Sequence, residues 1–444
     1  MRKNIKKLIA FAIGISVMSG SSISVFAAEN AKDNSTSIIN TSVTATASAN
    51  NTTTNTTTTT NNNSTGVIYI KDQVKQKPVL TLKEAIDAAI NNSGKLALKS
   101  KEIRLYEDKV DIQDELDDIQ GNDSDFPYDK LELTVDQTKE QKDYMEDQIA
   151  QDITNKYNDL ITKNNELNKI KKQLEFKTID NEYLKVKKDL GLSTAIEIKN
   201  AEVDFQTKKN EEKLKENQFK NAQDYFKILT EKDLNQYSLD QKQAFEVFKI
   251  DSSQDEYFDK VIDKYYKYDK KLIELTKDNL DDNKVDRPDS SDKPDINDSR
   301  FHKDSKDADG NVIGQVFDSV GYAAAQQAYE KSYTDYGTYL QNKYNLSSSK
   351  VSLEESKKNL KKGLKESYAK LIDKENSINV AKSNIAVKNT ELSIAKLKYD
   401  QGLTTKIAYD KQVLDNETLD TDLRTSINDY NTLKNQIQKP WLPS

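Results

Sequence analysis

Two stretches of this polar chain carry an apolar or aromatic residue at every seventh position, and this period constrains the fold more than any other feature. The first series is Ile153, Leu160, Leu167 and Leu174, and the second is Leu364, Leu371, Ile378, Ile385, Leu392 and Tyr399. A seven-residue period keeps one seam of a helix against a partner helix in a left-handed coiled coil. The spacing predicts long paired helices. Because the seams are thin, we also expect the chain to associate side by side into an oligomer.

The composition supports long helices over several compact domains. Of 444 residues, 32% are charged and 35% hydrophobic, and only 12 Gly and 6 Pro are available to interrupt a helix. The 74 acidic and 67 basic residues are finely mixed, which argues against a nucleic-acid partner. The chain has no Cys, and so no disulfide, no lipid anchor on cysteine and no thiolate metal site.

The first 66 residues are typical of an export signal followed by a spacer. Residues 1–28 combine a basic start, a short apolar run and small residues before a cleavage position after Ala27 or Ala28, the pattern of a signal peptide. Residues 29–66 are almost all Asn, Thr and Ser, which predicts a disordered tether. A tether that carries O-linked sugar is the alternative. We therefore expect an exported protein of the cell envelope.

The rest of the chain is predicted to be a tandem duplication. "GLSTAIEI", which begins at Gly191, recurs 211 positions later as "GLTTKIAY", which begins at Gly402. At the same offset, apolar and aromatic positions stay in register for about 70 residues without a gap, which indicates an internal repeat. A weaker match at an offset of 176 relates Ile86 to Ile262. We expect repeat 1 at residues 67–235 and repeat 2 at residues 236–444, with a charged loop at about 283–318.

The duplicated motif predicts the turn at the tip of a helical hairpin. A glycine after a long helix is expected in the left-handed conformation, and the Ser-Thr or Thr-Thr pair can cap the next helix. The leucine between them can close over the turn as an apolar contact. The alternative is a turn without any further role. The two tips consist of Gly191, Leu192, Ser193, Thr194, Gly402, Leu403, Thr404 and Thr405.

With these motifs in place, the chain resembles the TolC-like outer-membrane efflux protein family. "LTLKEAIDAAINNS", "KKDLGLSTAIEIKNAEVDF" and "KYDQGLTTKIAYDKQVLD" carry the resemblance, which covers roughly residues 79 to 438. It implies a homotrimer whose helices form a tunnel, continued by a β-barrel in the outer membrane. It also implies that the tips meet a membrane-fusion adaptor, which links the tunnel to an inner-membrane pump.

The chain departs from that family where the barrel strands would be inserted. Each such strand needs about 9–11 alternating residues. The first connector, "GNDSDFPYDKLELTVDQ", has room for one strand at most, "KLELTV", and the second connector is charged throughout without a lipid-facing alternation. We therefore expect an all-α fold of long antiparallel hairpins with a reduced or absent barrel.

No catalytic constellation is visible, so we expect neither an enzyme nor a cofactor. His302, the single histidine, lies in the charged connector, where a solvated loop residue is preferred over a catalytic base. "DSKDADGNV" weakly suggests a calcium loop, but Ser305 and Val316 stand where ligands belong. A tyrosine series is interpreted as a packing stripe, with an exposed contact surface as the alternative: Tyr329, Tyr333, Tyr336, Tyr339 and Tyr344.

Two functional classes remain from the sequence. The first is a passive oligomeric export conduit whose tips dock on an adaptor, placed in the outer membrane by the resemblance. The second is a coiled-coil scaffold or surface interaction protein that has lost the channel, placed at the cell surface or wall of a Gram-positive cell. The family resemblance favours the conduit, and the missing strands favour the scaffold.

Overall fold

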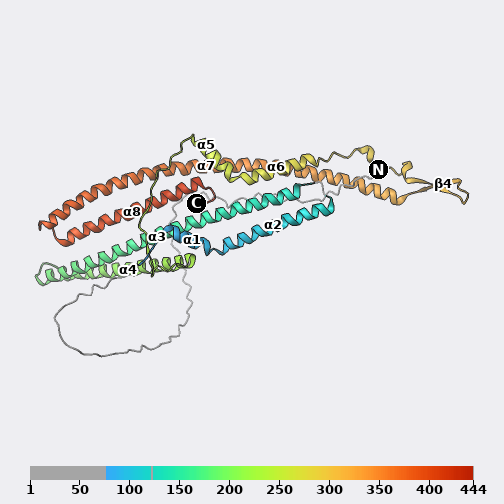
Figure 1. Ribbon diagram of the computed structural model, residues 1–444. Coiled ribbons are helices and arrows are strands. Elements are labelled where there is room, and N and C mark those ends of the chain that lie inside the picture. Colours follow the sequence, from blue (N-terminus) through green and yellow to red (C-terminus); the bar gives the residue numbers. More distant parts are fainter. Residues whose placement is uncertain (1–76, 122–123, 444) are drawn as a thin grey trace, which may run out of the picture.

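The computed structural model describes residues 77–121 and 124–443, so the predicted signal peptide and tether lie outside the described residues. Eight α-helices make up most of this part and confirm the predicted all-α fold (Figure 1). Their bounds are α1 Leu82–Asn91, α2 Gly94–Gln120, α3 Phe126–Asp189, α4 Ala195–Thr230, α5 Gln254–Tyr265, α6 Lys267–Asp282, α7 Ser319–Asp400 and α8 Lys406–Gln438. None of the described helices combines the length and hydrophobicity that crossing a membrane requires.

The helices repeat the same arrangement twice. Helices α3 and α4 form one long hairpin and α7 and α8 form the other, and each long helix is preceded by a pair of shorter helices, α1–α2 or α5–α6. Both hairpin tips lie at the same end of the elongated molecule (Figure 1). The long helices α3 and α7 span 64 and 82 residues, or about 96 and 123 Å at 1.5 Å per residue.

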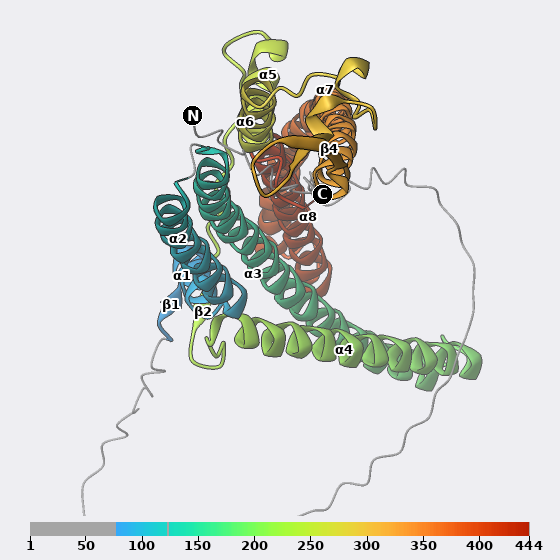
Figure 2. The same cartoon turned by 90° about the vertical axis from the view of Figure 1, so that its right-hand side faces the viewer.

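The packing order makes the molecule a bent layer one helix thick. In the half that carries the tips, α4 packs on α3, α3 on α8, and α8 on α7; in the other half the order is α2, α3, α6 and α7. Seen from the end, α2, α3 and α8 follow one another as a row (Figure 2). This order leaves α2 and α4 on one edge of the layer and α7 on the opposite edge.

Each repeat has its own apolar core. The core of repeat 1 joins α1, α3 and α4 around Ile153, Leu160 and Phe226, and that of repeat 2 joins α5, α7 and α8 around Leu364, Leu371 and Tyr430. At the offset of 211, Ile153 and Leu160 correspond to Leu364 and Leu371, and these seam residues are buried in both copies. Towards the second tip, Ile385, Leu392 and Tyr399 are only half-buried. The apolar seam thus holds each hairpin together internally.

The described residues contain four short strands, which form two separate two-stranded sheets. Strands β1 (Val79–Leu80) and β2 (Ser238–Leu239) are parallel neighbours, which ties the start of α1 to the segment between the repeats. Strands β3 (His302–Lys306) and β4 (Val312–Phe317) form an antiparallel hairpin with an irregularity after Ser305. Two 3-10 turns, η1 (Ser290–Asp292) and η2 (Ser299–Phe301), precede β3.

The connectors differ from their predictions in two ways. "KLELTV" is not a strand, because it lies inside α3, which begins one residue before Pro127, a residue suited to the first turn of a helix. Conversely, the charged second connector does contain strands, namely β3 and β4. Charged residues are tolerated there because a two-stranded hairpin exposes most of its side chains to water.

His302 is not the solvated loop residue that was predicted. It begins β3, is half-buried, and its Nδ1 lies 3.1 Å from the carbonyl oxygen of Asp298. Its ring lies 5.5 Å from that of Phe317. The residues of the suggested calcium loop form the turn of the β3–β4 hairpin, where the Asp307 carboxylate accepts hydrogen bonds from the backbone of Asp309 and Asn311. These bonds lower the pKa of Asp307.

The predicted tyrosine stripe lies on α7 and combines both interpretations. Tyr329, Tyr336 and Tyr339 are half-buried, whereas Tyr333 and Tyr344 are exposed. The Tyr329 and Tyr333 hydroxyls are 3.3 Å apart with their rings edge to face. The hydrogen bond to Tyr333 raises the pKa of Tyr329 to about 12.

Candidate functional site: the hairpin tips and the edges of the layer

The first tip ends α3 with a closed set of backbone hydrogen bonds. Gly191 is in the left-handed region with φ of 72°. Its N–H donates to the carbonyl of Lys188 over 2.8 Å, and the N–H of Leu192 donates to that of Lys187 over 2.8 Å. This is the Schellman pattern, which satisfies carbonyls that a helix end would otherwise leave unpaired.

The second tip repeats the geometry of the first. Gly402 also has φ of 72°. Its N–H donates to the carbonyl of Tyr399 over 2.9 Å, and the N–H of Leu403 donates to that of Lys398 over 2.8 Å. The left-handed glycine that the duplicated motif predicts is confirmed in both copies.

The helices that leave the tips are capped by the second hydroxyl residue of each motif. Thr194 caps α4 and Thr405 caps α8, each by accepting a hydrogen bond from the third residue of its helix. In the first tip, Glu197 completes a capping box, because its carboxylate accepts from the Thr194 backbone N–H over 2.7 Å. This hydrogen bond lowers the pKa of Glu197. In the second tip Ala408 occupies the corresponding position, so no carboxylate closes the box.

The tip leucines do not close over the turns as predicted. Leu192 is 74% exposed and Leu403 is 72% exposed. The side chains with which they would make an apolar contact, Val186 and Leu397, are also more than half exposed. Because the backbone hydrogen bonds already close each turn, the leucines are free to project into solvent. Each tip therefore presents a large, mostly exposed apolar side chain that the described residues leave uncovered.

Polar side chains hold the two hairpins against each other towards the tips. Lys172 on α3 is paired with Glu417 on α8 at 2.7 Å, and Lys411 on α8 with Asp180 on α3 at 2.8 Å. Further from the tips, amide side chains continue the same interface. Asn158 donates to Asn428 over 2.8 Å. The wider set of residues in this polar interface is Gln151, Asn155, Asn158, Arg424, Asn428, Thr432 and Asn435.

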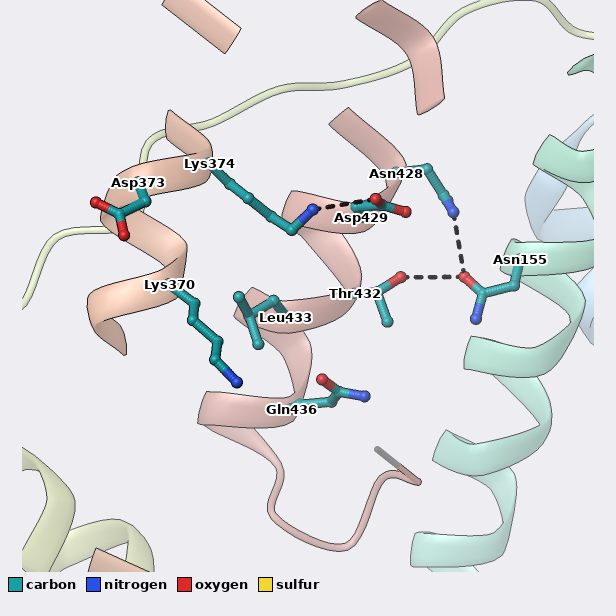
Figure 3. Close-up of a pocket in the computed structure, with 9 residues that line it drawn as sticks. All are labelled: Asn155, Lys370, Asp373, Lys374, Asn428, Asp429, Thr432, Leu433 and Gln436. Carbon is teal, nitrogen blue, oxygen red and sulfur yellow. Dashed lines mark hydrogen bonds and ion pairs between the residues drawn. The ribbon is translucent and has the colours of Figure 1, made fainter. Parts of the chain in front are cut away.

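A groove of 620 Å³ lies beside this polar interface, with α8 as its floor (Figure 3). Lys370, Asp373 and Lys374 line it from α7, and Asn155 reaches it from α3. Lys374 is paired with Asp429 at 3.1 Å. The lining has neither His nor Cys, and no metal-binding group of His, Cys, Asp or Glu occurs among the described residues. The groove has no visible catalytic arrangement.

Both edges of the layer expose apolar residues at helical intervals. On α2, Leu98, Leu105, Ile112 and Ile119 are spaced by seven and are between 51 and 80% exposed. On α7, exposures lie between 51 and 69% for Tyr344, Val351, Val380, Val387 and Ile394. Leu98, Val351 and Val380 each lie two positions from a buried seam residue, which places them on the opposite side of the helix at 100° per residue. These two stripes, the α2 stripe and the α7 stripe, face away from their own chain.

The α2 stripe was not predicted. Its seven-residue spacing is visible in the sequence, but only packing shows that this series, unlike Leu160 or Leu371, has no partner helix. The tips were found correctly, because their glycines and hydroxyl residues specify a local turn.

Comparisons with known proteins add only a likeness of fold. No protein-family model matches the chain, and no curated protein matches it. Similar solved structures include that of CusC, described in terms of folding and transmembrane channel formation, at 13% identity, 81% coverage of this chain, 90% of the other and a TM-score of 0.48. The CmeC outer membrane channel of Campylobacter jejuni matches at 14% identity, with coverages of 81 and 85% and a TM-score of 0.45.

The outer membrane protein VceC of Vibrio cholerae is similar at 10% identity, with coverages of 81% of this chain and 96% of the other and a TM-score of 0.41. The tips and edges described above are properties of this chain's own residues.

Proposed function

We propose that the chain is the protomer of a passive, oligomeric helical conduit for export, as its resemblance to the TolC-like family implies. The observation that carries the proposal is the pair of unpartnered apolar stripes on opposite edges of a layer one helix thick. A layer with such stripes on both edges can bury them only by meeting further layers. Head-to-tail contacts of this kind generate a ring when the rotation closes, and a homotrimer is the expected ring.

The tips are the proposed contact with a membrane-fusion adaptor and, through it, an inner-membrane pump. Two features support this role. The tips lie at the same end of the molecule (Figure 1), and each presents an exposed leucine that its own chain does not cover. At the first tip, Leu190 and Ile196, 68 and 72% exposed, extend the apolar surface of Leu192, and a contiguous exposed apolar patch is typical of a contact that a partner buries. We place the protein in the cell envelope.

The edge contact can be tested by replacing two members of the α2 stripe. We expect Leu105→Gln with Ile112→Gln to reduce the oligomer to monomer at micromolar concentration while the helix content stays unchanged. Size-exclusion chromatography with light scattering on residues 67–444 gives the mass, and circular dichroism gives the helix content. The matched control is Arg104→Gln with Asp111→Gln, which changes neighbouring exposed residues without altering the net charge.

The outcome also separates the conduit from its alternative. A wild-type chain that stays a folded monomer at all accessible concentrations would contradict the oligomeric conduit, because one layer cannot enclose a channel. That result would favour the coiled-coil scaffold of the cell surface or wall.

The tip contact can be tested separately from assembly. We expect Leu192→Asp with Leu403→Asp to keep the helix content and oligomer mass but to abolish capture of a membrane-fusion adaptor from the native envelope. Asn210→Asp with Asn384→Asp adds the same charge at exposed sites away from the tips and should leave capture unchanged. Capture at wild-type strength by the leucine variant would mean that the tips are only turns.

A further inference from the structure

The segment that follows α8 folds back onto repeat 1. Pro440 cannot continue a helix and disfavours helical geometry at Lys439, so α8 ends there. The N–H of Leu442 donates to the carbonyl of Lys439 over 3.0 Å, which closes a β-turn with proline at its second position. We call residues 439–442 the strap. Leu442 is buried, although it is the fourth residue beyond the helix.

The strap is attached to one short stretch of α3. The Trp441 ring stacks on that of Tyr144 at 4.1 Å and 14°. The Trp441 indole N–H donates to Asp147 over 2.9 Å, and the Lys439 ammonium is paired with the same carboxylate at 2.6 Å. The side chain of Gln148 donates to the Trp441 carbonyl over 2.6 Å. Aromatic, ionic and backbone contacts therefore converge within five residues of α3.

The same tryptophan also contacts the short helices of repeat 2. The Lys264 ammonium, near the end of α5, lies 5.4 Å from the centre of the Trp441 ring. Tyr265 lies 6.4 Å from Tyr144, which extends the aromatic group across the two repeats. Trp441 is thus in contact with α3 of repeat 1 and α5 of repeat 2 at once.

This bridge stands out because the hydrogen bonds and ion pairs that join α3 to α8 elsewhere are made by polar side chains. The apolar cores are separate clusters, one in each repeat. Between α3 and α8, amide side chains and lysine–carboxylate pairs make the contacts. Such contacts exchange readily with water and give little net adhesion. An aromatic stack adds apolar burial that water does not replace.

We propose that the strap is a releasable lock between the two repeats: docking of Trp441 on Tyr144 and Asp147 holds the two hairpins in one relative position, and release lets them move against each other as rigid units. The attachments share one short turn and one carboxylate. Loss of Asp147 therefore loosens Lys439 and Trp441 together. Each hairpin keeps its own core when the strap is released.

The sequence makes the lock easy to observe. Trp441 is the single tryptophan, and there is no native cysteine. Tryptophan emission, excited selectively over that of the 22 tyrosines, therefore reports the strap alone. Cysteines placed at exposed positions near the tips, Asn200→Cys on α4 and Gln412→Cys on α8, can carry spin labels. Diluting labelled chains into unlabelled wild type restricts the distance measurement to one protomer.

We expect Asp147→Ala to shift the Trp441 emission to longer wavelength, to raise its iodide quenching at least twofold, and to broaden the distance distribution between the labels. Trp441→Ala should broaden that distribution to the same extent, and Trp441→Phe, which keeps a ring but loses the N–H, should fall between. The control is Ile378→Val, which weakens the core of repeat 2 without touching the strap and should leave the distribution narrow.

Circular dichroism identifies variants in which the helices themselves have melted. Folded Asp147→Ala and Trp441→Ala chains with the wild-type distance distribution would overturn the proposal. So would a wild-type chain whose Trp441 fluorescence changes in denaturant only together with the loss of helix, since a releasable strap must detach first.

Discussion

The two repeats keep the same apolar seam but fasten the chain that joins them in different ways. In repeat 1 the buried hydroxyl of Tyr157, on the long helix α3, donates to the carbonyl of Leu80 over 2.7 Å and accepts from the N–H of Asp240 over 2.6 Å. In repeat 2 the corresponding role belongs to Tyr430 on the return helix α8, whose hydroxyl accepts from the N–H of Phe248 over 2.8 Å.

The repeat offset shows that these anchors are not equivalent residues. At 211 positions, Tyr157 corresponds to Tyr368 and Tyr430 corresponds to Phe219. The apolar spacing is therefore the same in both repeats, because shifting it would expose the seam of either hairpin. The polar anchors could differ, because each needs only one hydroxyl within reach of a backbone group. The comparison separates what forms a hairpin from what connects two hairpins.

The largest effects are expected where the repeats are most alike. Leu160 and Leu371 are equivalent and each is 1% exposed. We expect Leu160→Ala and Leu371→Ala each to lower the free energy of unfolding by about 2–5 kcal/mol, because a cavity remains in a packed core. Denaturant unfolding followed by circular dichroism measures the change.

The same pair tests whether the repeats unfold together. If the cores are independent, each variant should unfold its own hairpin at lower denaturant and produce two transitions. A single shifted transition in both variants would show that the repeats form one cooperative unit.

The anchors should give smaller and unequal effects. We expect Tyr157→Phe to lower the free energy of unfolding by about 1–3 kcal/mol, because the backbone groups of Leu80 and Asp240 lose a buried partner. Tyr430→Phe removes one accepted hydrogen bond and should cost less, about 1 kcal/mol. Tyr368→Phe, the counterpart of Tyr157, is the control. If Tyr368→Phe lowers the free energy of unfolding as much as Tyr157→Phe does, the two repeats do not use different anchors.

Alkaline pH should sharpen the difference between the repeats. Burial raises the pKa of Tyr257, Tyr265 and Tyr430 and raises that of Tyr266 to about 12, all in repeat 2, whereas in repeat 1 it raises the pKa of Tyr144 and Tyr157, so more of these rings lie in repeat 2. Unfolded tyrosine ionises near pH 10, so the stability that these neutral rings contribute is complete below pH 10 and is lost as the pH rises towards their folded pKa values. We expect repeat 2 to loosen before repeat 1 between about pH 10 and 12.

Hydrogen exchange quenched after alkaline pulses would follow each repeat separately. Tyr266→Phe should flatten the pH dependence of repeat 2, because phenylalanine has no proton to lose. If repeat 1 opens at a lower pH than repeat 2, the prediction is wrong.

Local chemistry explains which parts of the fold the sequence predicts. The turns and caps at the tips were predicted correctly, unlike the leucine contacts, because Gly191 and Gly402 follow long helices and hydroxyl residues stand where caps are needed. The helical seam was visible in its seven-residue period. The hairpin β3–β4 was missed because its strands carry residues such as Lys303 and Asp304 that do not alternate in hydropathy. Pairing with a neighbouring strand, not side-chain pattern, makes that segment extended.

The sequence does not predict which residues of different helices contact each other. Asn158 and Asn428 are indistinguishable in sequence from solvated residues, and only the approach of α3 to α8 makes them partners. The bridge through Trp441 likewise joins residues nearly 300 positions apart. The sequence predicts each hairpin, therefore, better than it predicts how two hairpins are held together.

The smallest expected effect concerns the capping box, which differs between the tips. Glu197 closes a capping box on α4, whereas Ala408 leaves the start of α8 without a carboxylate. Ala408→Glu should supply the missing acceptor and place a negative charge at the positive end of the α8 dipole, a gain of about 0.3–1 kcal/mol. Slower amide exchange in the first turn of α8 would record it, and Ala408→Lys, with the opposite charge, should speed that exchange.

Acid provides the reverse experiment on the first tip. Because hydrogen bonds to Thr194 lower the pKa of Glu197, its contribution is complete above the usual glutamate value of about 4.3 and disappears as the pH falls through the folded pKa. Protection of the backbone amides in the first turn of α4 against hydrogen exchange should therefore decrease in acid. In Glu197→Gln this protection should not depend on pH in the acid range. In Ala408→Glu the second tip should acquire the acid sensitivity of the first. If it does not, the capping box does not explain how the two tips differ.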